Sequence, residues 1–479
     1  MNPRADPRWT LAASVLASSL SFVDGSVLNV ALPAIRASYS AGAAEVQWVV
    51  NAYLLPLSAL LLLGGALGDH FGRRRLLIAG TLLFGIASLV CALAPSLALL
   101  LAARGMQGVG AALLLPNSLA LLNAAYEGEK RGRAVGIWAA AGAAAAAVAP
   151  LIGGWLVDSV GWPAIFYINL PLAAGAILLA LRFVGESRDP GSGRTDYAGA
   201  FLATAGLGAA TYGLTSWSSS GRLDTITIAA FVAGLMLLAG FLRVEQARGG
   251  KAMMPLDLFA DRCFTGLNLT TLLLYGAFGV VMLLVPYVLI AAGGYSPVQA
   301  GLALLPLPIF LAAGSPLMGQ LAGRIGPRLP LTIGPVVVAA GMLLGLRIGA
   351  DDSYWTNVLP AMSVMALGMT IAVAPLTSSV LGSVEEKHVA MASGFNSAVA
   401  RLGALVATAL LGVVLSTEGD ALVGSFHGAL VASGLAAAAA GVVAWVSLRS
   451  SKSPPRHAPR RGSGPAGSTA APAFPCVGR

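Results

Sequence analysis

Apolar runs of eighteen or more residues follow one another along most of the chain and leave few alternatives for its fold. The 479 residues are 57% hydrophobic and only 10% charged, and the mean hydropathy is +0.80. Runs of this length are typical of transmembrane segments. A helix satisfies its own backbone hydrogen bonds, which lipid cannot do. The sequence therefore predicts an all-α integral membrane protein and excludes a soluble globular domain.

Fourteen hydrophobic segments can be placed, approximately at residues 10–33, 47–68, 76–94, 97–123, 133–157, 162–183, 197–217, 225–243, 263–290, 298–322, 330–349, 355–381, 389–415 and 427–448. We expect four regions, namely a six-helix bundle (1–183), a linker with an inserted pair of spans (184–262), a second six-helix bundle (263–448) and a disordered cytoplasmic tail (449–479). The tail is rich in Pro, Gly, Ser, Ala and Arg, a composition typical of disorder.

The distribution of Lys and Arg predicts the orientation. If the N-terminus is cytoplasmic, the outer loops hold only three of the 29 Lys and Arg residues, Arg36, Arg222 and Arg347. Arg104 and Arg401 fall inside spans, and the remainder face the cytoplasm. The positive-inside rule therefore predicts both termini in the cytoplasm of a multi-pass protein of the cytoplasmic membrane. This distribution also explains the pI near 9.8 without a nucleic-acid partner.

A short charged hinge joins the second and third segments at residues 65–75, Gly-Ala-Leu-Gly-Asp-His-Phe-Gly-Arg-Arg-Arg. A degenerate copy follows at residues 319–328, Gly-Gln-Leu-Ala-Gly-Arg-Ile-Gly-Pro-Arg. Gly65, Gly72 and Arg74 align, at a constant offset of 254 residues, with Gly319, Gly326 and Arg328. A hinge repeated in both halves of a membrane protein indicates two related bundles and favours a transporter.

Asp24 is the one acidic residue near the middle of an apolar run. An ionisable side chain at that depth costs roughly 2.5–3.5 kcal/mol on insertion scales and is a functional candidate. Because burial disfavours the charged form of a carboxyl group, the sequence predicts that Asp24 gains and loses a proton at physiological pH. A structural hydrogen bond to a neighbouring helix is the alternative.

Arg104 and Arg401 are the basic residues inside spans. An arginine stays protonated, so we expect Arg104 to act as a fixed charge that biases the titration of a nearby acid. For Arg401, a functional role and snorkelling of the side chain to the cytoplasmic interface both remain open.

Polar candidates for the wall of a substrate cavity are spread over several spans: Asn29, Asn51, Asn117, Asn268, Tyr275, Asn396 and Arg401. A hydrogen bond between helices explains each asparagine or tyrosine equally well.

The fifth segment is unusual because residues 139–149 are almost all alanine and are followed by Pro150, Gly153 and Gly154. Such a smooth face allows close helix packing, and a proline permits a kink.

Together these features resemble the drug:proton antiporters of the major facilitator superfamily with fourteen spans, the EmrB/QacA type. The hinge resembles the family loop G-x-L-a-D-r-x-G-r-k, and residues 24–33 resemble the span 1 signature D-x-T-[IV]-[VL]-N-V-A-L-P. The run around Arg104 resembles l-x-x-x-R-x-x-Q-G-x-G-a-a, and residues 149–154 resemble the antiporter motif g-x-x-x-G-P-x-x-G-G. Residues 162–171, including Asn169, and the segment around Arg401 are also similar to this group.

The resemblance implies two pseudo-symmetric six-helix bundles plus two inserted helices, with proton coupling at Asp24 and Arg104. It implies a gating hinge of Gly65, Asp69, Gly72, Arg73 and Arg74, and an antiporter motif of Pro150, Gly153 and Gly154. We expect Asp69 to face a helix N-terminus or a basic partner, and Arg73 and Arg74 to bind carboxylates or lipid phosphates. The hinge would latch the inward side in the outward-facing state. The chain departs from the family patterns at His70, Ala145, Ala149 and Pro163.

We expect proton-coupled efflux of lipophilic small molecules, such as drugs or antibiotics, by alternating access in a monomer surrounded by lipid and without a cofactor. A single acidic residue favours neutral, monocationic or weakly polar substrates. A proton-independent or importing carrier of a small metabolite is the alternative. An enzyme is not expected, because the four histidines are widely separated without metal-ligand spacing. ATP-driven export is not expected either, because no lysine completes a Walker A motif.

Overall fold

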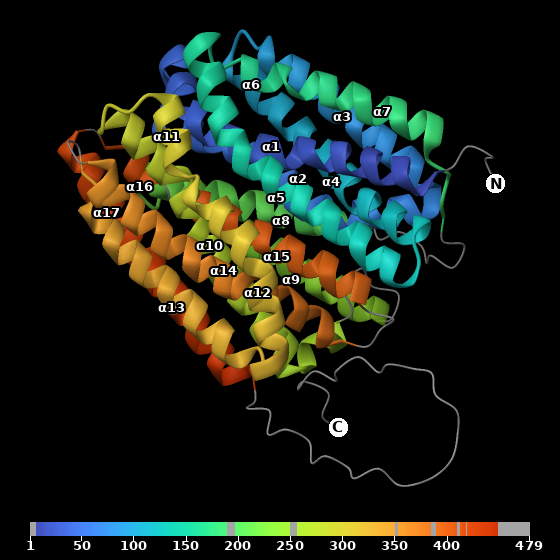
Figure 1. Cartoon of the computed structure of the whole chain (residues 1–479). Coiled ribbons are helices and arrows are strands. Elements are labelled where there is room, and N and C mark those ends of the chain that lie inside the picture. Colours follow the sequence, from blue (N-terminus) through green and yellow to red (C-terminus); the bar gives the residue numbers. More distant parts are fainter. Residues whose placement is uncertain are drawn as a thin grey trace, which may run out of the picture.

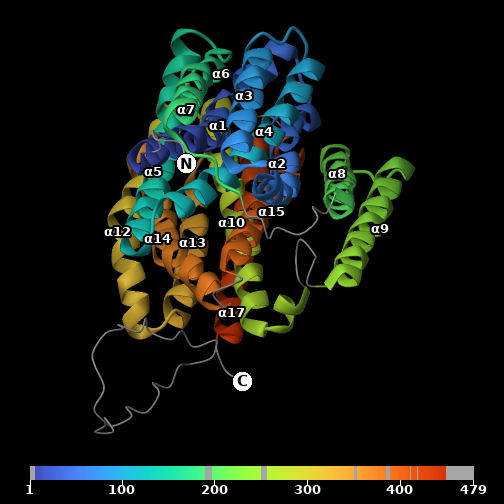
Figure 2. The same ribbon diagram turned by 90° about the vertical axis from the view of Figure 1, so that its right-hand side faces the viewer.

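The computed structural model describes residues 6–188, 197–249, 256–349, 353–384, 389–409, 412–417 and 419–448. The predicted tail at 449–479 therefore lies outside the described residues, as do parts of the linker at 189–196 and 250–255. The described residues fold into two helical bundles with a separate pair of helices on one flank (Figures 1 and 2).

The first bundle contains α1 (Pro7–Tyr39), α2 (Ala43–Phe71), α3 (Arg73–Ala92), α4 (Leu97–Ala125), α5 (Gly128–Ser159), α6 (Ala164–Tyr167) and α7 (Asn169–Phe183). The inserted pair is α8 (Tyr197–Ser220) and α9 (Thr225–Arg248). After a 3₁₀ turn at Leu256–Ala260, the second bundle contains α10 (Arg262–Ala291), α11 (Pro297–Ala303), α12 (Pro306–Ile325), α13 (Arg328–Leu344), α14 (Leu359–Gly382), α15 (Val389–Ala409), α16 (Gly412–Leu415) and α17 (Asp420–Ser447). A 3₁₀ turn (Gly345–Arg347) and a π-helical turn (Tyr354–Val358) flank the loop before α14.

Helices occupy all fourteen predicted segments. Within the described residues, twelve helices are long and apolar enough to cross a membrane. The segments at 197–217 and 389–415, which hold α8 and α15 with α16, are not among these twelve. The prediction of an all-α membrane fold is confirmed, and the count of fourteen spans stays a prediction.

Local chemistry sets helix ends that hydrophobicity alone misses. Helix α2 begins at Ala43, before the apolar run, because the Glu45 carboxylate accepts a hydrogen bond of 2.7 Å from the Gly42 backbone N–H. The predicted segment at 298–322 is divided between α11 and α12, and Pro306 stands at the first position of α12. Proline has no backbone N–H, so it suits a helix start and interrupts a continuous helix.

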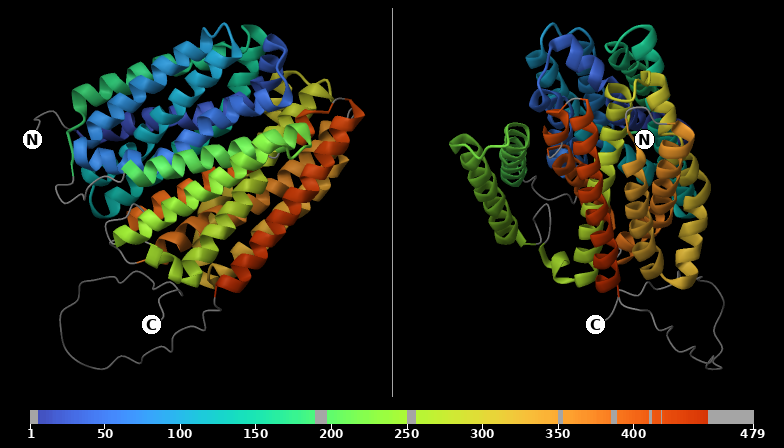
Figure 3. Two further views of the ribbon diagram at one scale, coloured as in Figure 1. Left: turned by 180° about the vertical axis from the view of Figure 1, so that it is seen from behind. Right: turned by 90° about the vertical axis from the view of Figure 1, so that its left-hand side faces the viewer.

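The two bundles converge at one end and diverge at the other (Figures 1 and 3). At the converging end, Arg36 Nη1 donates to the Tyr287 hydroxyl at 2.6 Å, and the Val298 backbone N–H donates to Asp158 Oδ2 at 3.3 Å. We call this end, marked by Arg36, Asp158, Tyr287 and Val298, the closed end. Its loops are those that the distribution of Lys and Arg places outside the cell.

Glycines bring α5 and α11 into backbone contact at the closed end. A Cβ atom added at Gly154 would lie 2.4 Å from the Pro297 carbonyl oxygen, and one added at Gly301 would lie 2.5 Å from the Pro150 carbonyl oxygen. Side chains larger than hydrogen are therefore excluded at both positions in this conformation.

The inserted pair lies outside both bundles. Helices α8 and α9 pack on each other, and α8 also packs against α2 and, less extensively, against α15 and α16. Figures 2 and 3 show the pair on the flank where α2 and α15 meet. The pair therefore contacts both halves through one helix.

Candidate functional site

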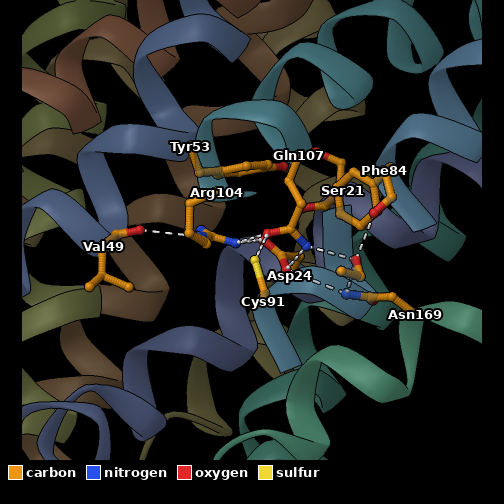
Figure 4. A network of polar contacts seen from close by, with 10 residues as sticks. Ser21, Asp24, Val49, Tyr53, Phe84, Cys91, Arg104, Gln107 and Asn169 are labelled. Carbon is orange, nitrogen blue, oxygen red and sulfur yellow. Dashed lines mark hydrogen bonds and ion pairs between the residues drawn. The ribbon is translucent and has the colours of Figure 1, made fainter. Parts of the chain in front are cut away.

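Asp24 lies in a buried ion pair inside the first bundle. Oδ2 of Asp24 lies 2.5 Å from Nη1 of Arg104, and both side chains are 1% exposed (Figure 4). The sequence predicted a carboxyl group surrounded by hydrocarbon with a cation nearby. The structure brings the two residues into direct contact, so the carboxyl group is not isolated.

The second carboxylate oxygen of Asp24 accepts hydrogen bonds from two side-chain amides. Gln107 Nε2 lies 3.2 Å and Asn169 Nδ2 lies 3.4 Å from Oδ1. Both amides also donate to the Ser88 hydroxyl, at 2.8 and 3.3 Å. Helices α1, α3, α4 and α7 therefore supply one connected network of hydrogen bonds around the carboxyl group.

Arg104 is also held by groups other than Asp24. Its Nε donates to the Val49 carbonyl oxygen at 3.0 Å, and Nη1 also donates to Gln107 Oε1 at 2.9 Å. The guanidinium carbon lies 4.5 Å from the centroid of the Tyr53 ring, a cation–π contact. The Tyr53 hydroxyl is in turn 2.6 Å from the Ser21 hydroxyl. These contacts fix the cation independently of Asp24.

The spacing along α4 explains how this site forms. Arg104 and Gln107 are three residues apart and therefore share one face of the helix. Gly108 brings that face close to α2, since an added Cβ would lie 2.3 Å from the Tyr53 carbonyl oxygen. Gln107 and Asn169 stand in segments that already resembled family patterns, whereas nothing in the sequence singled out Ser88 or Tyr53.

The predicted gating hinge is a second polar cluster, at the diverging end. Asp69 Oδ1 pairs with Arg73, with Nε and Nη2 both at 2.8 Å. Arg73 Nη1 also donates to the Ser187 hydroxyl at 3.1 Å. Gly72, between the two helices, has φ +113°, and an added Cβ would lie 2.7 Å from the Glu186 carboxyl carbon. A glycine is therefore required there on both counts.

Arg74 differs from the expectation. Its guanidinium binds backbone carbonyl oxygens instead of a carboxylate or phosphate, with Nε 2.9 Å from Ala180 O and Nη2 2.5 Å from Leu181 O. These are carbonyls of the last turns of α7, where the helix dipole attracts a cation. The carboxylate of Glu186 instead accepts a hydrogen bond of 3.0 Å from the Arg74 backbone N–H.

The degenerate copy of the hinge has the same geometry. Gly326 has φ +85° between α12 and α13, as Gly72 has a positive φ between α2 and α3. Arg328 Nε donates to the Trp445 carbonyl oxygen of α17 at 3.1 Å, as Arg74 donates to carbonyls of α7. The aligned residues thus occupy equivalent places in the two halves, in agreement with the predicted repeat.

The remaining candidates are distributed over several environments. Gly153 of the antiporter motif packs on α1, where an added Cβ would lie 2.2 Å from Val27 Cγ2, whereas Pro150 and Gly154 contact α11. Gly65 has room for a Cβ at 3.5 Å from Pro116 Cβ. Asn117 is buried between α2 and α4 and donates to the Gly64 carbonyl oxygen at 2.9 Å, so it joins two helices of one bundle.

The other amide candidates also form hydrogen bonds within the protein. The Asn51 side chain contacts Thr215 and Thr408, and the Asn396 amide oxygen accepts a hydrogen bond of 2.7 Å from the Thr271 hydroxyl. Asn268 Nδ2 donates to its own helix at Phe264 O, at 2.9 Å. Asn29 is buried in α1, and Tyr275 and Arg401 are partly buried.

Comparisons with known proteins agree with this architecture. The family model described as Major Facilitator Superfamily matches residues 14–244 and 267–477. Similar solved structures include a D-xylose-proton symporter (TM-score 0.67, 15% identity, 93% of this chain and 98% of that chain). Another is a bacterial homologue of the lysosomal transporter Spinster, in an inward-facing and unoccupied conformation (TM-score 0.61, 18% identity, 93% and 97%). At these identities the likeness shows the fold alone.

Relatives of known name are similar over most of their length. The multidrug resistance protein Stp of Mycobacterium tuberculosis is 35% identical to this chain, over 85% of this chain's length and 75% of its own length. The methylenomycin A resistance protein of Bacillus subtilis is 34% identical over 90% and 92%, and the tetracenomycin C resistance and export protein of Streptomyces glaucescens is 29% identical over 87% and 77%. With its two related bundles, the chain belongs to the Major Facilitator Superfamily and is a multi-pass membrane carrier.

Proposed function

We propose that the protein exports lipophilic small molecules, such as antibiotics, from the cytoplasm in exchange for protons. The observation that carries this proposal is the Asp24–Arg104 ion pair, a titratable group and a fixed cation 2.5 Å apart inside an apolar bundle. Relatives named for resistance to several antibiotics support the choice of substrate class. We also propose fourteen spans, both termini in the cytoplasm of the cytoplasmic membrane, and function as a monomer.

Proton binding would act on the ion pair directly. A proton on Asp24 cancels the attraction between the carboxylate and Arg104, while Val49, Gln107 and Tyr53 continue to hold the guanidinium. The carboxyl group is then free to exchange the ion pair for other contacts, which alters the balance between inward- and outward-facing conformations. In this proposal, the conformation with the closed end together is the inward-facing state, which follows proton release.

The gradient supplies enough energy for useful export. One proton that crosses 100 mV releases about 2.3 kcal/mol, roughly a 40-fold concentration ratio for a neutral substrate.

The hinge would contribute to the conformational change by exchanging its binding partners. In this conformation, Asp69, Arg73 and Arg74 bind within the first half and its linker. In the outward-facing state, we propose that the hinge latches the cytoplasmic ends of the two halves.

The test is uptake into inverted membrane vesicles driven by an acidic interior, with methylenomycin A and tetracenomycin C as the first compounds. We expect the wild type to accumulate a substrate and an uncoupler to abolish the accumulation. Asp24→Asn should lose accumulation and keep passive exchange. Asp224→Asn is the matched control, because Asp224 is an exposed helix cap at which asparagine serves equally well. Uptake that an uncoupler leaves unchanged would instead identify a proton-independent carrier.

A further inference from the structure

Arg401 is a cation near the middle of α15 without a partner in the described residues. Its side chain is partly buried, and no described residue forms a hydrogen bond or an ion pair with its guanidinium group. The guanidinium group of Arg104, by contrast, forms three hydrogen bonds. A charged group at this depth is costly unless something neutralises it.

The packing of α15 shows which way Arg401 points. Gly403 lies against α10, since an added Cβ would lie 2.6 Å from the Leu272 carbonyl oxygen, and Asn396 contacts Thr271 of the same helix. At about 100° per residue, Arg401 is roughly 200° around the helix from Gly403 and so faces away from α10. Thr408, seven residues on and therefore on the same face, contacts Asn51 of α2. Arg401 thus faces the first half.

The same contact fixes the depth of Arg401. Thr408 and Asn51 join the two halves near the closed end, and Arg401 lies two helical turns, about 10 Å, toward the diverging end. The Arg401 charge also acts on the Tyr53 hydroxyl, whose ring contacts Arg104. Arg401 therefore stands where the two halves begin to separate, close to the proton-binding network.

Within the described part of the second half, no acid is placed to neutralise Arg401. Asp420, at the start of α17, is the one acidic residue described between 263 and 448, and the other five in the sequence, Asp351, Asp352, Glu385, Glu386 and Glu418, lie outside the described residues. Asp24 is the one acidic residue at this depth in the first half, and it already forms an ion pair with Arg104. The region between the halves therefore carries an excess positive charge, which increases when Asp24 is protonated.

We propose that Arg401 binds the anionic group of the substrate, so that the exported compounds include lipophilic organic acids with a carboxylate or phenolate. This inference rests on the proposed export function and replaces our expectation of neutral or cationic substrates. A guanidinium binds a carboxylate through two parallel hydrogen bonds, which gives orientation as well as affinity. The apolar remainder of such a compound would lie against the surrounding helices.

The test is equilibrium binding to the purified full-length protein in nanodiscs, without any gradient, with three probes that share one fluorophore. Dansylglycine carries a carboxylate, dansylglycinamide is neutral and dansylcadaverine carries an ammonium group. We expect the wild type to bind dansylglycine most tightly. Arg401→Gln should lower the affinity for dansylglycine about tenfold or more, and the affinity for dansylglycinamide less than about twofold. Arg401→Lys should retain much of the preference for the acid.

Arg222→Gln is the matched control, because Arg222 lies exposed in the loop between α8 and α9 and should leave all three affinities unchanged. Equal loss for all probes in Arg401→Gln would overturn the proposal. A wild type that binds the amine at least as well as the acid would overturn it without any variant, even if Arg401→Gln does not fold. Since binding needs no gradient, failure here is distinguishable from absence of proton-driven uptake.

Discussion

The Thr408 hydroxyl of the second half donates a hydrogen bond to the side-chain oxygen of Asn51 in the first half. The Asn51 side-chain nitrogen donates in turn to the Thr215 hydroxyl of α8, at 3.4 Å. All three side chains are buried. One amide therefore joins both halves and the inserted pair near the closed end.

Thr408→Val keeps the shape of the side chain and removes this donor. Leaving the Asn51 oxygen buried and unpaired costs about 1–3 kcal/mol, so the closed end should separate more often. Electron–electron distance measurements between spin labels at Ser159 and Leu302 should show a larger fraction of long distances. Thr377→Val, which removes only a bond to the same helix, is the control. Identical distance distributions in both variants would contradict the role of Thr408.

The Asp24–Arg104 pair should show strong coupling in stability. Removing one partner of a buried ion pair costs about 3–5 kcal/mol, because the other charge remains buried without compensation. Asp24→Asn and Arg104→Gln should each destabilise the protein, and the double variant should cost much less than the sum. Chemical unfolding of the four proteins in one detergent measures this. Additive costs would show that the two side chains do not interact.

Gly154→Ala tests the backbone contact between α5 and α11. The new methyl group would overlap the Pro297 carbonyl oxygen, at 2.4 Å, so the closed end should open and transport should slow. The spin-label pair at Ser159 and Leu302 reports the opening. Gly136→Ala in the same helix, where an added Cβ meets nothing within 4 Å, should behave as wild type. A normal closed-end distance in Gly154→Ala would refute the steric account.

Two glycines of the hinge region should respond differently to alanine. A Cβ at Gly68 would lie 1.6 Å from the Asn117 amide oxygen, whereas a Cβ at Gly65 would lie at an ordinary 3.5 Å from Pro116. Gly68→Ala must displace the Asn117 side chain, which then loses its hydrogen bond to the Gly64 carbonyl oxygen. We therefore expect the unfolding free energy to fall by about 1–3 kcal/mol. Gly65→Ala should change the unfolding free energy little. Equal effects would mean that α2 and α4 adjust freely at this contact.

The architecture could be predicted from the sequence because hydrophobic length and periodicity are local properties. Helices occupy every predicted segment, and the repeated hinge predicted two equivalent halves, with which the positive φ of both Gly72 and Gly326 agrees. Helix ends were less accurate, since caps such as Glu45 extend a helix beyond its apolar run. The sequence does contain a signal for the break between α11 and α12, namely Pro306, but hydropathy alone does not use it.

The site could be predicted only in part. Asp24 and Arg104 were identifiable as charges at bilayer depth, but their contact joins residues 80 positions apart. Tyr53 and Ser88 are ordinary residues in a helix, and only the packing of four helices makes them part of the network. The partners of Arg74 were missed for a related reason, because backbone carbonyls at the end of α7 leave no mark in a sequence pattern.

The position of the inserted pair gives the two flanks of the molecule different access to the bilayer. Helix α8 covers the side where α2 and α15 meet, whereas within the described residues neither inserted helix packs on the side of α5 and α12 (Figure 2). A compound dissolved among the acyl chains therefore meets a shielded flank on one side and a bare flank on the other.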